Sequence, residues 1–119
     1  MDEAILNTGL TLAMDFGSDW LTPIKERLST KFSTLSPKQL DQYDKVCRQA
    51  MTRGYQFIYK RLESVTNERK TIRNADLKTE LKDFLHKTHP WISEENLSKL
   101  HSQSIYYAYK DGLHLCLLD

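Results

Sequence analysis

The chain has 119 residues, with 17 Lys and Arg against 16 Asp and Glu, which leaves room for one domain of nearly neutral charge. Its 39% apolar and 28% charged residues exclude a disordered or fibrous chain, and four Gly and three Pro exclude a β-protein with many tight turns. No apolar run approaches the roughly 20 residues of a membrane span, so we expect no membrane association.

The first segments show helical spacing of apolar residues. Residues 2–15 carry one broad apolar stripe with intervals of three and four, which predicts an amphipathic helix. Gly17-Ser18 breaks the pattern, and Thr22-Pro23 then predicts the start of a second helix over about 23–34. In this interpretation Thr22 caps the helix, and Pro23 occupies the first turn, where its missing N–H has no partner to lose.

The longest predicted helix covers about 37–66. It opens on Ser36-Pro37, and Gln39 stands at the reciprocal position of a capping box. Gly54 lies on the apolar stripe in mid-helix, where it costs about 1 kcal/mol relative to Ala. We therefore expect either a close helix crossing or a bend there. The stripe consists of Leu40, Tyr43, Cys47, Ala50, Met51, Gly54, Ile58, Leu62 and Val65.

A polar segment separates this helix from two more. Residues 67–74 are too polar for a core and predict a linker, whose Asn74 caps a fourth helix over about 75–88. Pro90 ends this helix, since proline disfavours helical geometry in the preceding residue. Ser93 then caps a fifth helix over about 94–111.

The end of the chain is apolar. Gly112 suits a left-handed position after the fifth helix, with Leu113 packing back. Four leucines occur in the last seven residues, so we expect this tail to be buried against its own bundle or against a second copy. The sequence thus predicts an all-α fold, a single bundle of about five helices over residues 1–119 with a short apolar C-terminal tail.

The termini and cysteines indicate a cytoplasmic protein. The first residues are acidic, whereas a secretory signal begins with positive charge and a mitochondrial presequence is rich in arginine. Cys47 and Cys116 are 69 positions apart and show no metal-binding or redox spacing. We expect both to be reduced thiols.

The basic residues are concentrated in the middle of the chain. Residues 21–90 have a net charge of +7, between acidic segments 1–20 and 91–119 with net charges of −4 and −2. Basic and acidic residues alternate within the middle segment, which is typical of solvated helix faces. Nucleic-acid binding is therefore a third hypothesis that we do not favour.

Motifs with catalytic or metal-binding chemistry are weak. Asp83, His86 and His89 fall three residues apart and could share a helical face as a two-histidine, one-carboxylate set. However, the four-residue spacing that suits chelation along a helix is missing, His89 precedes Pro90, and no second helix supplies a matching ligand pair. We expect no metal and no cofactor. Tyr106 and Lys110 share the Y-x-x-x-K spacing of a dehydrogenase family, but the chain lacks the glycine-rich motif of a dinucleotide site. Catalysis is not the favoured hypothesis.

Tyrosines crowd two helices and point to binding surfaces. Rings on successive faces of a helix cannot all reach one core, so some face solvent, a ligand or another chain. The favoured hypothesis is a protein-interaction or regulatory module that self-associates, as a homodimer or with a protein partner. The candidate interface residues are Tyr106, Tyr109, Leu113, Leu115, Leu117 and Leu118.

The alternative hypothesis is a bundle that binds or transforms a small molecule. Basic residues alternate with tyrosines along the long helix, which suits a phosphate-bearing ligand. The identity of such a ligand does not follow from the sequence. The candidate ligand-binding residues are Arg48, Arg53, Tyr55, Tyr59 and Tyr107, with His86, His89 or His101 nearby.

Overall fold

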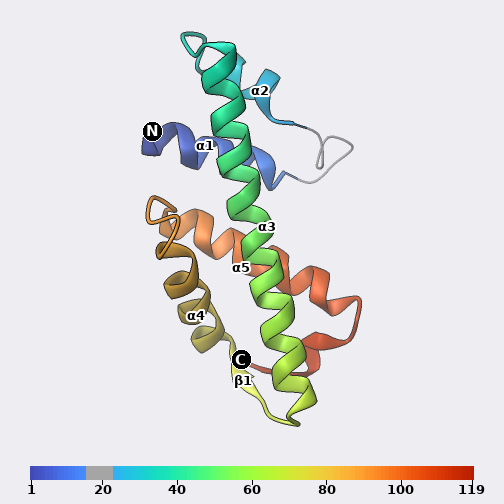
Figure 1. Ribbon diagram of the computed structural model, residues 1–119. Helices are drawn as coiled ribbons and strands as arrows, with labels where there is room; N and C mark the ends of the chain where they lie inside the picture. The colour runs from blue at the N-terminus through green and yellow to red at the C-terminus, as the bar shows by residue number, and fades with distance from the viewer. Residues whose placement is uncertain (16–22) are drawn as a thin grey trace.

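One long helix organises the fold in the computed structural model, which describes residues 1–15 and 23–119. This helix, α3 (Pro37–Asn67), has 31 residues and is about 46 Å long at 1.5 Å per residue, close to the 51 Å long axis of the molecule. The other helices pack along it (Figure 1). They are α1 (Glu3–Ala13), α2 (Lys25–Lys31), α4 (Asn74–His86), α5 (Glu94–Tyr109) and the short 3-10 helix η1 (Leu113–Cys116).

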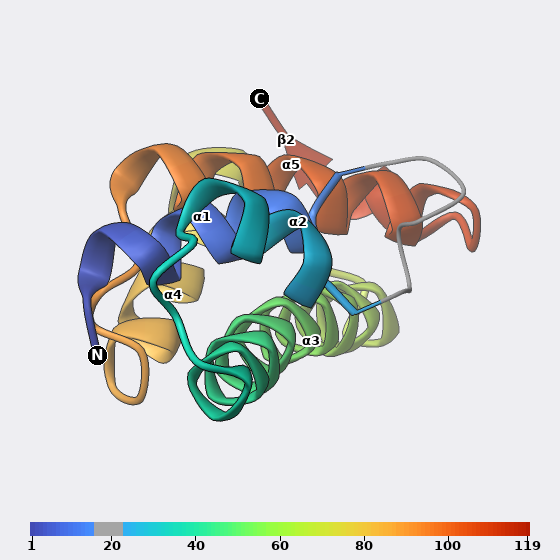
Figure 2. The same ribbon diagram turned by 90° about the horizontal axis from the view of Figure 1, so that it is seen from above.

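The helices form two layers. α1, α2 and α5 lie on one side of α3 (Figure 2), and the smallest dimension of the molecule is 19 Å, about two helix diameters. The radius of gyration is 15.3 Å, compared with about 13.5 Å for a compact domain of this length. The predicted all-α fold is confirmed, and it is elongated because α3 is longer than the elements that cover it.

The predicted boundaries hold best where a capping signal was complete. The Ser36–Gln39 capping box is present at the start of α3, and Ser93 accepts a hydrogen bond from the Asn96 backbone N–H at the start of α5. Gly112 adopts the left-handed conformation, with φ of 74°. α5 ends at Tyr109, two residues before the predicted end.

Two predicted helix starts differ from the structure. α2 begins at Lys25, and the Ile24 backbone N–H donates to Asp44 Oδ1 at 2.9 Å, so a carboxylate of α3 takes the place of a local cap. The predicted cap Thr22 lies outside the described residues. The prediction that Asn74 caps the fourth helix is wrong, because Asn74 is its first residue and its buried Oδ1 has no hydrogen-bond partner among the described residues.

The predicted linker and tail pair with each other. β1 (Ile72–Arg73) and β2 (Leu117–Leu118) form a two-stranded parallel sheet that the sequence pattern did not indicate. Ile72 is buried. Strand pairing over two residues leaves no alternation to detect, and the two strands are far apart in the chain.

Two glycines permit the closest helix crossings. A Cβ on Gly54 of α3 would lie 2.5 Å from Leu100 Cδ2 of α5, and a Cβ on Gly9 of α1 would lie 2.7 Å from Cys47 Sγ of α3. Leu100 and Cys47 are fully buried, so neither side chain has space to withdraw. A close helix crossing therefore accounts for the mid-helix glycine.

We predict that Gly54→Ala destabilises the protein by about 1–3 kcal/mol, although alanine favours helix, because the added methyl overlaps the Leu100 side chain. The free energy of unfolding is measured by urea denaturation. The matched control is the same change in a Leu100→Ala background, where the overlap is absent and Gly54→Ala is expected to stabilise. Equal effects in both backgrounds would contradict the steric explanation.

Candidate functional site

Three of the five candidate ligand-binding residues meet at one pocket between α3 and α5. Tyr55, Tyr59 and Tyr107 line a pocket of about 290 Å³, with Gln56 and Lys60 at its side. The Tyr55 and Tyr107 rings meet edge to face at 5.3 Å. The Tyr55 hydroxyl donates to Gln103 Oε1 and the Tyr59 hydroxyl to Asp111 Oδ2, both at 2.8 Å. These two hydroxyls bond α3 to α5 and to the turn after it, so the pocket offers mainly ring faces.

Arg53 belongs to a different pocket, on the α4 side of the same helix. This pocket has a volume of about 470 Å³, and Phe57 and Phe84 form its aromatic part. Gln56 and Lys60 line both pockets, which are therefore adjacent. Arg48 lines neither pocket, so the structure separates the predicted ligand-binding set.

The predicted interface residues divide into exposed and buried groups. Tyr106, Tyr109, Leu115 and Leu118 are exposed to 58%, 60%, 79% and 48%. We call these four residues the C-terminal apolar surface. Leu113 is buried in the chain's own core, and Leu117 is partly buried against it.

Stacking contacts connect part of this surface. The Tyr109 ring stacks on His114 with centroids 4.0 Å apart. Lys110 Nζ lies 5.7 Å from the centroid of Tyr106 and 5.6 Å from that of Tyr107. Tyr106 and Lys110 of the Y-x-x-x-K pattern thus interact through the ring face of the tyrosine, as a cation–π contact.

The histidines at the end of α4 are engaged in local contacts. His86 Nε2 lies 3.1 Å from the Ile92 carbonyl oxygen, and His89 Nδ1 lies 2.7 Å from Thr88 Oγ1. Burial lowers the pKa of His89, and the nearby Arg53 charge lowers it further. Within residues 1–15 and 23–119, no three His, Cys, Asp or Glu side chains are grouped so that they could hold a metal ion.

Both cysteines are buried free thiols. Burial raises the pKa of Cys47 to about 12, with a smaller contribution from Asp44. Cys47 Sγ donates to the Leu6 carbonyl at 3.3 Å, and Cys116 Sγ to the Leu113 carbonyl at 3.2 Å. Thiols in such surroundings are poor nucleophiles.

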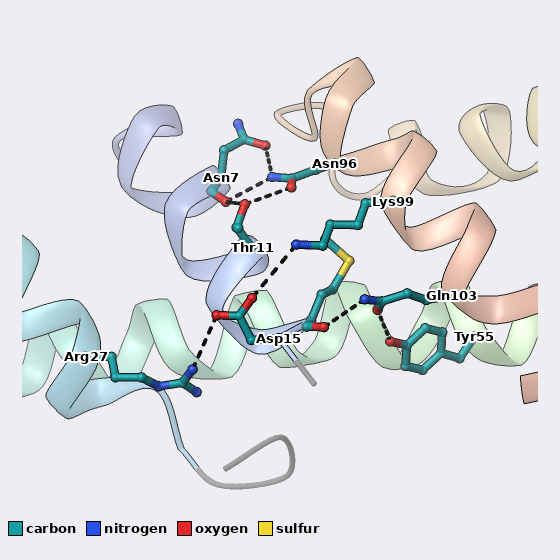
Figure 3. A network of polar contacts seen from close by, with 9 residues as sticks. Asn7, Thr11, Asp15, Arg27, Tyr55, Asn96, Lys99 and Gln103 are labelled. Atoms are coloured by element: carbon teal, nitrogen blue, oxygen red, sulfur yellow. Dashed lines mark hydrogen bonds and ion pairs between the residues drawn. The ribbon is translucent and has the colours of Figure 1, made fainter. Parts of the chain in front are cut away.

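A polar network between α1 and α5 was missed by the sequence analysis. Asn96 Nδ2 donates to Asn7 Oδ1 and to the Asn7 carbonyl, and Thr11 Oγ1 donates to Asn96 Oδ1 (Figure 3). Asn7 Nδ2 also donates to the Trp91 carbonyl, and the Ser93 N–H donates to Asn7 Oδ1. Asn7 therefore ties α1 both to α5 and to the turn before it.

The same interface continues toward the end of α1. Gln103 Nε2 donates to the Met14 carbonyl at 2.8 Å, which provides a partner for a carbonyl just after α1. Asp15 lies between two cations: its Oδ2 is 3.7 Å from Arg27 Nη1, and its Oδ1 is 3.9 Å from Lys99 Nζ. Asn96 and Gln103 are seven residues apart on the buried face of α5, and this spacing of polar residues on an apolar stripe was the available signal.

Comparison with known proteins gives no match: no protein-family model, curated protein or solved structure is similar to this chain. Among the described residues, none of the helices has the length and apolar character needed to cross a membrane.

We predict that Asn96→Ala lowers the free energy of unfolding by about 1–3 kcal/mol, because it removes three side-chain hydrogen bonds from a buried interface. Urea denaturation measures the change. Ser102→Ala on the exposed face of the same helix is the control and is expected to stay within about 0.5 kcal/mol. A loss as small as that of the control would show that the network is dispensable.

We also predict that stability falls as the pH is lowered from 7.5 to 5.5. Burial lowers the pKa of both His89 and His101 below the ordinary 6.5, and the nearby Arg53 and Lys78 add to these shifts. The unfolded chain binds protons at these imidazoles near pH 6.5, whereas the folded chain does not, so acid favours unfolding. Urea denaturation midpoints measured across this pH range give the slope of stability against pH. His89→Gln with His101→Gln should flatten it, and an unchanged slope in this variant would contradict the assignment.

Proposed function

We propose that this chain is a protein-interaction module that self-associates as a homodimer through the C-terminal apolar surface. The observation that supports the proposal is the uneven distribution of exposed apolar side chains. Among the described residues, six large apolar side chains are exposed, and five of them follow residue 58. Tyr106, Tyr109, Leu115 and Leu118 lie in α5 and the tail after it, and the fifth, Tyr59, is bonded to Asp111 next to them.

The composition of this surface suits an interface. Tyrosine rings bury a large apolar area while their hydroxyls remain able to bond water at the rim, and they are enriched in protein interfaces. Single exposed apolar residues are normal on protein surfaces, whereas four within residues 106–118 are more than a chance scatter would place there, which supports a binding site in this segment. The exposure of Leu115 at 79% has no counterpart among the other described leucines.

The charges beside this surface favour a second copy of the chain as the partner. Lys110 and Asp111 are neighbours at the end of α5, and both are exposed. A two-fold axis places the same patch on both subunits, so each Lys110 can face the other subunit's acidic residue. A partner with a single sign of charge would leave one of the two residues uncompensated.

We infer a reducing location, the cytoplasm, for this module. Cys47 and Cys116 are both buried as free thiols, and each donates to a backbone carbonyl. Free buried cysteines are common in cytoplasmic proteins.

A second candidate function, small-molecule binding, is supported by the pocket that Tyr55, Tyr59 and Tyr107 share between α3 and α5. Its 290 Å³ volume lies at the lower limit for small-molecule sites. Because the Tyr55 and Tyr59 hydroxyls are bonded within the chain, this pocket suits an uncharged apolar ligand. Such a ligand would quench or shift tyrosine fluorescence in the wild type, and a Tyr107→Ala variant would not respond.

We predict that the full-length chain elutes as a dimer, at twice its mass of 14.0 kDa, in light scattering behind a sizing column. Leu115→Glu should give a monomer with an unchanged urea midpoint, because Leu115 is exposed and the charge is buried only in the dimer. Thr52→Glu, on an exposed position of α3, is the matched control and should remain dimeric. A wild type that is monomeric at all concentrations would contradict self-association.

A point variant tests this surface more cleanly than a truncation. Deleting residues 113–119 removes the buried Leu113 and Cys116 together with β2, so the truncated chain is expected to lose stability whether or not a dimer forms.

A further inference from the structure

The pocket between α3 and α4 has an aromatic floor. Phe57 of α3 and Phe84 of α4 stack with ring centroids 4.6 Å apart and an interplanar angle of 22°. Both rings are only partly buried, and both line the 470 Å³ pocket. This volume is within the range of small-molecule sites.

The walls of this pocket carry positive charge. Arg53, Lys60 and Arg61 line it, together with the neutral Gln56 and Ser64, and none of its lining residues is acidic. Arg61 is compensated, since its Nε donates to Glu80 Oε1 at 2.7 Å. Within the described parts of the chain, Arg53 and Lys60 form no ion pair, so two cations remain uncompensated.

Arg53 is held by a ring instead of by an anion. Its guanidinium carbon lies 4.9 Å from the centroid of Phe84, and its buried Nε has no hydrogen-bond partner in the described structure. Its charge contributes, after burial, to the lowered pKa of His89. An arginine oriented by stacking and not neutralised by a carboxylate is typical of anion recognition.

We propose that this pocket binds a phosphate monoester whose alcohol part carries a planar ring, as in a nucleoside monophosphate. Two uncompensated cations match a phosphate group, which carries about −1.5 to −2 charges at pH 7, better than they match a carboxylate. Arg53 and Lys60 bind the phosphate, with the Ser64 hydroxyl and the Gln56 amide as further donors at the pocket wall. The flat ring packs on the exposed parts of Phe57 and Phe84.

This site is separate from the proposed dimer surface. None of the residues of the C-terminal apolar surface lines the pocket, so binding and self-association can succeed or fail independently.

Isothermal titration calorimetry of the full chain with adenosine monophosphate tests the proposal. Saturable binding is expected, with affinity at least tenfold weaker for adenosine, which lacks the charge, and for inorganic phosphate, which lacks the ring. Proton chemical shifts of the Phe57 and Phe84 rings should move on titration, which places the ligand in this pocket. Absence of saturable binding to millimolar adenosine monophosphate overturns the proposal, and so does equal affinity for inorganic phosphate.

Charge variants provide the residue-level test. Lys60→Gln and Arg53→Gln should each weaken binding of adenosine monophosphate by about tenfold or more, because each removes a charge-assisted hydrogen bond. Lys60 is exposed, so Lys60→Gln keeps the fold even if Arg53→Gln does not, which far-ultraviolet circular dichroism verifies. Lys45→Gln removes an exposed charge elsewhere on α3 and should leave the affinity unchanged. Equal weakening by Lys45→Gln would indicate a general charge effect and overturn the assignment.

Discussion

The close crossing of α3 and α5 is the contact on which the rest of the structure depends. Leu100 packs where a side chain at position 54 would be, so the two helices approach within a distance that only glycine permits. This crossing fixes where α5 lies along α3, and hence which residues of α5 and of the turn after it meet Tyr55 and Tyr59. A methyl group at the crossing would separate the helices, and every contact on both sides of it would change.

Polar contacts then set the position of α1 on this scaffold. Burying asparagine and glutamine is costly unless each polar atom finds a partner, so the Asn7–Asn96 and Gln103–Met14 hydrogen bonds permit only a narrow range of α1 positions. The apolar contacts around them supply most of the favourable free energy but tolerate sliding of one helix along another. The network therefore specifies the arrangement more than it stabilises it.

An elongated fold of two layers leaves much of α3 uncovered, and this has consequences for binding. The exposed positions Gln56 and Lys60 lie between two pockets, one lined by tyrosines toward α5 and one lined by cations and phenylalanines toward α4. Four of the six exposed large apolar side chains among the described residues belong to the end of α5 or the tail after it. The surface proposed for self-association and the pocket proposed for a ligand are thus built from different residues.

The sequence by itself determined the helices, because helical spacing and caps are local: the apolar stripe and capping box of α3, the Ser93 cap and the left-handed Gly112 were all predicted. It also indicated that Gly54 faced a crossing or a bend, and that some tyrosine rings would lie outside the core, as Tyr59, Tyr106 and Tyr109 do. Only the tertiary structure showed that a close helix crossing accounts for Gly54, because the residue that it contacts, Leu100, is 46 positions away in the chain. The tertiary structure also buries Leu113 and exposes Leu115. The hydrogen bond from the Ile24 N–H to Asp44 accompanies the start of α2 at Lys25, and Arg53 lines a different pocket from the tyrosines. Each of these outcomes depends on contacts between segments far apart in the chain, which periodicity and capping patterns do not encode.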